Sequence, residues 1–157
     1  MISSILRERG FNGRFHIFDS FEGLSTLSEQ DKNERFDLSA EEIDAQAQTF
    51  ACTEDVVRDN LKEFSFIRTY KGWIPTRFHE VQNHKFSLIH VDVDLYAPYR
   101  DTIEFFYPLL LPGGAMVFDD YGLSQFPGAK AAVDEALEKF TPSFFYQVPT
   151  GGAFLVA

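Results

Sequence analysis

The 157-residue chain is poor in cysteine, in basic runs and in long apolar stretches, and each shortage excludes a class of protein. Its one thiol, Cys52, permits neither an internal disulfide nor a thiolate cage for a metal. With 14 basic against 24 acidic side chains, the formal net charge is −10. Nucleic acid and anionic membranes are therefore unfavourable partners. No stretch approaches the roughly 20 apolar residues of a membrane-spanning helix.

The first residues carry charge where a secretory signal would be apolar, since Arg7, Glu8 and Arg9 follow closely on the amino terminus. We therefore expect a cytoplasmic location. The length suits one domain, residues 1–157, large enough to enclose a core. The 18 phenylalanines indicate that aromatic rings fill much of that core.

Apolar runs and helical stretches alternate along the chain, a pattern typical of an α/β fold with a mostly parallel, doubly wound sheet. Strands are predicted at 14–18, 66–70, 86–91, 114–119, 144–148 and 153–156, the last two forming an antiparallel hairpin. Helices are predicted at 2–9, 54–64, 99–110 and 127–140, with one or two helical turns within 74–81. The polar stretch 29–48 is predicted to be a lid or an insertion, with a short helix near 40–47.

Two acidic clusters end the two most apolar of these runs. Asp92 and Asp94 follow the run 86–91, and Asp119 and Asp120 close the next one. Because ligands bind at the carboxyl ends of strands in an open α/β sheet, we expect the four side chains to meet at one edge. Converging carboxylates repel one another, and a hard divalent cation is the common remedy. The pattern predicts a metal-assisted enzyme, with helix capping as the alternative for any single aspartate.

Two further positions suit a nucleotide-like ligand. Asp19 ends the predicted strand 14–18, where an acidic residue commonly accepts hydrogen bonds from ribose hydroxyls, although a solvated turn aspartate fits equally well. Trp73 follows a strand and a glycine, and it could stack on an adenine ring or simply line the core or a cleft.

Six segments in register resemble the macrocin O-methyltransferase family, whose members methylate sugar hydroxyls of macrolide and aminocoumarin antibiotics. The likeness runs from about residue 14 to residue 136. The segments that carry it are Phe18–Leu24, Lys71–Trp73, His90–Tyr96, Leu111–Gly114, Asp119–Gly122 and Gly128–Glu135. The resemblance implies a Rossmann-like class I methyltransferase fold, S-adenosylmethionine and Mg²⁺ as cofactors, and a small hydroxylated, sugar-like acceptor.

The resemblance also implies roles for the acidic residues. The first aspartate of the family's Asp-x-Asp-Leu-Tyr motif binds Mg²⁺, which makes Asp92 the candidate here. The two aspartates of the Asp-Asp-Tyr motif are ligands as well, which points to Asp119 and Asp120. The second aspartate of Asp-x-Asp is the general base, so Asp94 is expected to take the proton of the acceptor hydroxyl.

The cofactor residues follow in the same way. The aspartate of Asp-Ser-Phe holds the ribose of S-adenosylmethionine, so Asp19 is expected to do so, with Ser20 beside it. Trp73 matches a position that lines the adenine pocket. Asp92 is counted with these cofactor-binding residues as well as with the metal ligands.

The chain departs from the family at its beginning. Class I methyltransferases start with a central strand and a Gly-x-Gly loop that carries the amino-acid end of the cofactor. Here Gly10-x-x-Gly13 follows a helix, so we expect a chain that lacks the first strand of the fold and starts inside the first helix after that loop. We also expect the strand 14–18 to pair directly with the strand 86–91, closing the gap.

Two functions of different classes remain open from the sequence. The carboxylate set favours a methyltransferase, whereas the absent glycine loop favours a catalytically impaired remnant that binds a metal or a partner. Metal-dependent phosphoryl hydrolysis is unfavourable, because no phosphate-binding loop or basic partner is present. An unpaired sheet edge would favour a homo-oligomer.

Overall fold

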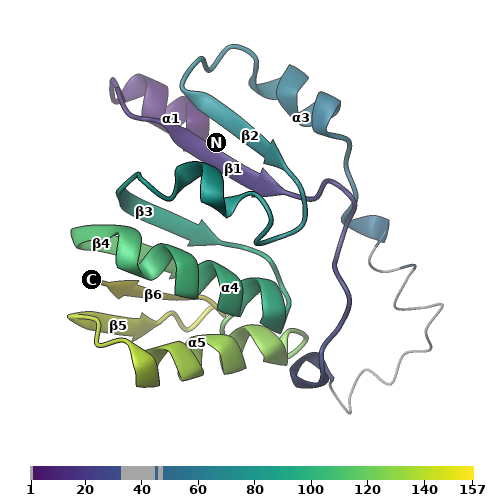
Figure 1. Cartoon of the computed structure of the whole chain (residues 1–157), viewed down its shortest axis with the longest axis vertical. Coiled ribbons are helices and arrows are strands. Elements are labelled where there is room, and N and C mark those ends of the chain that lie inside the picture. Colours follow the sequence, from purple (N-terminus) through teal and green to yellow (C-terminus); the bar gives the residue numbers. More distant parts are fainter. Residues whose placement is uncertain (1, 33–44, 46–47) are drawn as a thin grey trace.

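The computed structural model describes residues 2–32, 45 and 48–157 and contains two sheets flanked by helices (Figure 1). The strands are β1 (Phe15–Asp19), β2 (Ile67–Lys71), β3 (Phe86–Val91), β4 (Leu110–Phe118), β5 (Phe144–Gln147) and β6 (Ala153–Val156). The helices are α1 (Ile2–Glu8), α3 (Glu54–Leu61), α4 (Tyr96–Phe106) and α5 (Pro127–Lys139). Short 3-10 turns are η1 (Glu29–Asp31), η2 (Phe78–Val81) and η3 (Tyr107–Leu109).

The larger sheet has the strand order β3-β4-β6-β5. β3 and β4 are parallel, whereas β6 lies antiparallel to both β4 and β5. The predicted antiparallel hairpin at the carboxyl end is thereby confirmed, and its second strand, β6, is the one that joins the sheet. The parallel strands β3 and β4 point their carboxyl ends to the same edge, which is where the acidic clusters follow.

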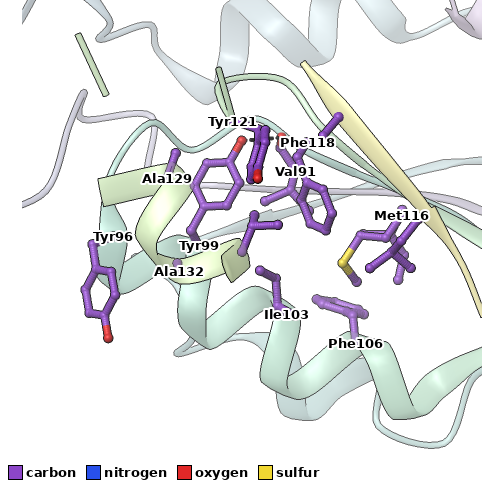
Figure 2. Close-up of a cluster of buried hydrophobic side chains, with 14 of the residues drawn as sticks. Val91, Tyr96, Tyr99, Ile103, Phe106, Met116, Phe118, Tyr121, Ala129 and Ala132 are labelled. Atoms are coloured by element: carbon purple, nitrogen blue, oxygen red, sulfur yellow. Dashed lines mark hydrogen bonds between the residues drawn. The ribbon is translucent and has the colours of Figure 1, made fainter. Parts of the chain in front are cut away.

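The main core lies between this sheet and the helices α4 and α5, which run side by side in front of it (Figure 1). α4 places Tyr99, Ile103 and Phe106 toward the sheet, because residues three and four apart share one helical face. Figure 2 shows these side chains packed against Met116 and Phe118 of β4. The four-stranded sheet is therefore anchored by side chains that are almost entirely removed from water.

The smaller sheet consists of β1 and β2, which are parallel and pair from Phe15 with Ile67 to Asp19 with Lys71. It packs less tightly than the larger sheet, since every residue of β1 stays at least partly exposed. Aromatic rings connect the two halves: Phe18 lies edge-on to Phe106, with ring centroids 5.8 Å apart. The halves thus meet through side chains.

The predicted pairing of strand 14–18 with strand 86–91 is wrong. Within the described residues β1 pairs with β2 alone and β3 with β4 alone, so the two sheets stay separate. Pairing would bring the backbones to about 4.8 Å. Instead the two strands contact each other through side chains: the rings of His16 and Phe86 lie edge-on, with centroids 5.9 Å apart. An apolar cavity of about 250 Å³ separates their facing edges.

The other predicted elements lie where expected, with shifted ends. α4 begins at Tyr96 instead of residue 99, because Pro98 sits in the first turn, where a missing N–H costs nothing. β4 begins at Leu110 and runs through Gly113, which has a φ of +76° that glycine adopts without strain. Thr53 occupies the N-cap of α3 but makes no capping bond with its side chain. The helix predicted near 40–47 falls outside the described residues.

In the part of the chain that the structure describes, no helix is both long enough and apolar enough to cross a membrane.

Candidate active site

The candidate site lies where three parallel strands end. β1 ends at Asp19, β3 leads into Asp92, and β4 leads into Asp119. The Asp119 N–H donates to the Val91 carbonyl at 3.0 Å and so joins the ends of β3 and β4. The Gly72 N–H donates to the Asp19 carbonyl at 3.0 Å and joins the ends of β1 and β2. A cavity of about 340 Å³ opens beside them. It is lined by Phe18, Asp19, Ser20, Gly23, Leu24, Ser25, Phe50, Trp73, Ile74, Asp92, Val93, Asp94 and Pro98.

Three carboxylates converge at one end of this site. Asp92, Asp119 and Asp120 each offer an oxygen, and these oxygens all lie within 4.8 Å of one another. Opposite ligands of an octahedral ion lie roughly 4.2 Å apart around Mg²⁺ and roughly 4.8 Å apart around Ca²⁺. The three oxygens are thus close enough together to serve as ligands of one hard divalent cation.

The electrostatics of the trio favour a cation as well. Loss of hydration raises the pKa of Asp92, and the nearby charge of Asp119 raises it further. Burial likewise raises the pKa of Asp120, which is 3% exposed, although a hydrogen bond from Tyr99 opposes the shift. Both shifts mean that negative charge is unfavourable here without a counter-ion. A divalent cation would supply it.

Tyr99, on the first turns of α4, holds Asp120 in place. Its hydroxyl accepts a hydrogen bond from the Asp120 backbone N–H at 3.1 Å. The same hydroxyl lies within donating distance of Asp120 Oδ2, at 3.1 Å, and of the Val91 carbonyl, at 3.0 Å. One buried side chain therefore fixes both the backbone and the carboxylate of a candidate ligand. From the sequence Tyr99 looks like another core residue of an amphipathic helix. The one signal for its contact with Asp120 was its position about one helical turn after the acidic end of β3.

Asp94 adjoins the trio without being part of it. Its backbone N–H donates to Asp120 Oδ2 at 3.3 Å. Its φ of 59° shows that the chain has left the extended conformation, so Asp92 and Asp94 do not share a strand face. Burial, followed by the charges of Asp120 and Asp92, raises the pKa of Asp94 to about 7. A carboxyl group with that pKa can take up a proton near neutral pH.

His90 lies at the outer side of the trio. Its Nε2 is 3.5 Å from Asp119 Oδ1, and both side chains are substantially exposed to solvent. The structure therefore places His90 at an exposed edge of the site.

The opposite wall of the cavity carries the residues expected to bind the cofactor. Asp19 Oδ1 accepts the N–H of Phe21 at 2.6 Å, which fixes the carboxylate in a tight turn. Ser20 is buried, and its hydroxyl donates to the Gly23 carbonyl at 3.2 Å while accepting the Glu22 N–H at 3.0 Å. Ser20 therefore shapes the turn that presents Asp19.

Trp73 stands on the same wall, 39% exposed, and lines the cavity together with Asp19. Its indole is thus open to a ligand, as a stacking position requires. The structure brings Asp19, Ser20, Trp73, Asp92 and Asp94 around one cavity, whereas Asp119 and Asp120 lie behind Asp92.

Asp31 is a buried acidic residue that the sequence did not single out, because it lies in a polar stretch. Its Oδ1 accepts the Tyr96 N–H at 2.7 Å, so it caps the amino end of α4. Its Oδ2 accepts the N–H of Ser28 at 2.8 Å and the Ser28 hydroxyl at 2.6 Å. Gly128 of α5 leaves the room for it, since a Cβ there would come within 1.9 Å of Asp31 Oδ1. Asp31 therefore connects η1 to α4 through a hydrogen bond and to α5 through close packing against Gly128.

A family model confirms what the motifs suggested. The model of the macrocin-O-methyltransferase (TylF) family matches residues 1–141. The chain belongs to this family.

Two curated relatives come from antibiotic pathways of Streptomyces. Demethyldecarbamoylnovobiocin O-methyltransferase of Streptomyces niveus is 26% identical over 145 residues, which cover 89% of this chain and 53% of that protein. A tetracenomycin-C 4'-O-methyltransferase of Streptomyces olivaceus, whose substrate name includes a dimethoxy-rhamnosyl group, is 26% identical over 125 residues, 76% of this chain and 47% of that protein. The chain therefore spans about half the length of the curated relatives it matches.

Solved structures support the fold. The O-methyltransferase NovP superposes with a TM-score of 0.76 at 23% identity, covering 99% of this chain and 64% of that chain. The calicheamicin methyltransferase CalS11 superposes with a TM-score of 0.73 at 20% identity, covering 99% of this chain and 66% of that chain. The predicted class I methyltransferase architecture, α/β with a partly parallel sheet and a terminal antiparallel hairpin, is thereby confirmed.

Proposed function

We propose that this chain carries the site of an S-adenosylmethionine- and Mg²⁺-dependent O-methyltransferase that methylates a hydroxyl of a sugar or similar polyol. The observation that carries the proposal is the convergence of Asp92, Asp119 and Asp120 beside a cavity walled by Asp19 and Trp73. Membership of the macrocin-O-methyltransferase family and relatives named for sugar-bearing antibiotics support the choice of acceptor.

Each residue of the site then has a chemical task. Asp92, Asp119 and Asp120 would hold the metal, which lowers the pKa of a coordinated hydroxyl and orients it. Asp94, whose pKa burial and the neighbouring carboxylates raise to about 7 in the metal-free chain, would take the hydroxyl proton as the oxygen becomes a nucleophile. Tyr99 keeps Asp120 from turning away during this step.

The cofactor wall completes the reaction. The Asp19 carboxylate accepts hydrogen bonds from the ribose hydroxyls, and Trp73 packs on the adenine. S-adenosylmethionine supplies a methyl group on a sulfonium, so the oxygen gains the methyl while the sulfur leaves as a neutral thioether. No further group has to react, so alignment of the two reactants accounts for much of the rate enhancement.

Calorimetric titration with S-adenosylhomocysteine, with and without Mg²⁺, tests the proposal. We expect micromolar binding that Asp19→Asn weakens and that Phe144→Ala, on the remote strand β5, leaves unchanged. We expect Asp120→Asn to weaken Mg²⁺ binding by about 100-fold. Absence of both heats in the unmodified chain would contradict the proposal.

A second candidate is a metal- or partner-binding module without methyl transfer. It is favoured by the separation of the two sheets, because the residues for the cofactor and for the metal come from different sheets. The same titrations decide between them: Mg²⁺ binding with no response to S-adenosylhomocysteine would support the module.

A further inference from the structure

The turn that carries Asp94 has a strained backbone. The φ of Asp94, 59°, is left-handed, and the Leu95 N–H donates to the Val93 carbonyl at 2.6 Å. A hydrogen bond from one residue to the second residue before it closes a γ-turn, and the form with positive φ is rare and strained. Such a backbone persists where the surrounding contacts over-determine it. The contacts that hold this turn therefore decide where the Asp94 carboxylate lies.

Two hydrogen bonds to distant parts of the chain hold this turn. The Asp94 N–H donates to Asp120 Oδ2 at 3.3 Å. The Tyr96 N–H donates to Asp31 Oδ1 at 2.7 Å, and this second bond is both shorter and more deeply buried. Tyr96 is the first residue of α4, and the side chain of its N-cap residue, Leu95, makes no capping bond. Asp31 supplies the acceptor instead, and a carboxylate is favourable at the positive end of a helix.

Asp31 is held in place by its own turn, η1. It is 8% exposed, and both oxygens of its carboxylate accept hydrogen bonds. While Oδ1 faces α4, Oδ2 accepts the Ser28 N–H at 2.8 Å and the Ser28 hydroxyl at 2.6 Å. Because each oxygen serves a different element, the carboxylate fixes η1 to the amino end of α4.

Gly128, in the first turn of α5, leaves the space that this contact needs. A Cβ at this position would lie 1.9 Å from Asp31 Oδ1 and 2.8 Å from the Tyr96 Cβ, so the carboxylate would have to move. Gly128 is not among the glycines with positive φ, so space and not backbone freedom explains the residue. Figure 1 shows η1, in dark blue, beside the amino end of α5. Three elements therefore meet at one carboxylate.

The segment that ends at Asp31 also walls the candidate site. Residues 18–20 and 23–25 line the 340 Å³ cavity, as does Asp94, and η1 follows these residues closely in the chain. Asp31 itself is not among the lining residues. The cofactor wall extends from the sheet of β1 and β2, whereas Asp94 follows β3 of the other sheet. Asp31 thus connects the cofactor wall to the turn of Asp94.

We propose that Asp31 is a positioning residue for Asp94. By accepting the Tyr96 N–H, it holds the strained turn in the conformation that places the Asp94 carboxylate at the cavity. Loss of this contact lets the turn relax to a negative φ and moves the carboxylate away from Asp120. The inference rests on the proposed function, in which Asp94 is the general base, and it adds a residue whose carboxylate is engaged by the protein alone.

Amide hydrogen exchange, followed by NMR on the full chain without metal or cofactor, tests the contact. We expect the Tyr96 amide to exchange slowly in the unmodified chain and about tenfold faster in Asp31→Ala, which removes the acceptor. Gly128→Ala should act in the same direction, because the added methyl group displaces the carboxylate. Glu29→Gln is the matched control in the same turn, since its side chain is 83% exposed, and it should leave the exchange unchanged.

The φ of Asp94 separates positioning from general stabilisation. The coupling between the amide and α protons of Asp94, together with its Cα shift, reports φ in the folded chain. We expect a left-handed signature in the unmodified chain and its loss in Asp31→Ala and Gly128→Ala. A left-handed Asp94 in both variants would overturn the proposal, because Asp31 would then contribute to stability alone.

The unmodified chain keeps the proposal testable if the variants do not fold. Rapid exchange of the Tyr96 amide in that chain would overturn it, whereas slow exchange with a left-handed Asp94 would support it. The NMR measurements need neither S-adenosylhomocysteine nor Mg²⁺. A chain that passes them and fails both titrations retains the role of Asp31 in holding Asp94 and loses the proposed function.

Discussion

The two sheets of this chain are buried to different degrees. In the four-stranded sheet Met116 and Leu155 are almost fully removed from water beneath α4 and α5. In the two-stranded sheet every residue of β1 remains at least partly exposed. Both sequence and neighbours contribute to the difference: β2 contains Arg68 and Lys71, and β1 has a strand on one side alone among the described residues.

This contrast divides the candidate site into two parts. The carboxylate trio and Tyr99 belong to the tightly packed half, since they follow β3 and β4 or lie on α4. Asp19, Ser20 and Trp73 belong to the loosely packed half. We therefore expect the metal end of the site to keep its geometry when the cofactor end is perturbed.

The largest effect should come from the packed core. Ile103→Ala removes a fully buried side chain of α4, and we expect it to lower the free energy of unfolding by about 2–5 kcal/mol. Ile17→Ala in β1 should cost about 1 kcal/mol or less, because its side chain is partly exposed already. Urea denaturation measures both. Equal losses would show that the two halves are packed alike.

The second effect concerns pH. Because the folded state raises the pKa of Asp94 from 3.8 to about 7, the folded chain binds more protons than the unfolded chain between these values. Stability without metal should therefore fall as the pH rises from about 4 to 7, by at most about 4 kcal/mol and by less to the extent that solvent screens this partly exposed carboxyl group. Asp94→Asn should flatten that slope, as measured by urea denaturation at several pH values. An unchanged slope would contradict the raised pKa.

The third effect separates the two ends of the site. Asp120→Asn should weaken Mg²⁺ binding by about 100-fold, because one of three carboxylates loses its charge. Trp73→Ala should leave Mg²⁺ binding within twofold, since its indole lines the cofactor wall. Calorimetry with Mg²⁺ measures both variants. A large loss in Trp73→Ala would show that the halves are coupled more strongly than their packing indicates.

The smallest effect should come from one hydroxyl. Tyr99→Phe removes the group that holds Asp120, and we expect Mg²⁺ affinity to drop by about tenfold. Tyr121→Phe is the matched control, because its buried hydroxyl bonds Asp134 instead. Equal effects of the two variants on Mg²⁺ affinity would remove Tyr99 from the site.

The sequence predicted that Asp92, Asp119 and Asp120 would meet at one edge, and the structure brings them together; the signal for this convergence is local. Asp92 and Asp119 follow apolar runs, and parallel strands bring their ends together without further information. It did not predict the conformation of Asp94, since a positive φ in a non-glycine residue depends on contacts made by the folded chain. Tyr99 and Asp31 were missed because their partners lie 21 and 65 residues away in the sequence.

The relation between the two sheets was the part that sequence reasoning got wrong. Strand pairing was inferred from a gap in the expected order, as if β1 and β3 were free to approach. The strands instead meet through contacts between aromatic rings, such as His16 with Phe86, and a pattern of apolar runs does not show how such large side chains pack. Elements were predictable from local composition, whereas the spacing between sheets depends on how large side chains fit together.

The left-handed backbone at Asp94 limits which residues that position can accept. Aspartate and asparagine tolerate such a φ, whereas valine or isoleucine would force the loop to rearrange. The backbone N–H of Asp94 also donates a hydrogen bond to the Asp120 carboxylate. A bulky replacement at position 94 would therefore disturb Asp120 at the metal end of the site as well as remove the proposed general base. Asparagine thus isolates the loss of one negative charge, and any larger side chain would mix a chemical change with a geometric one.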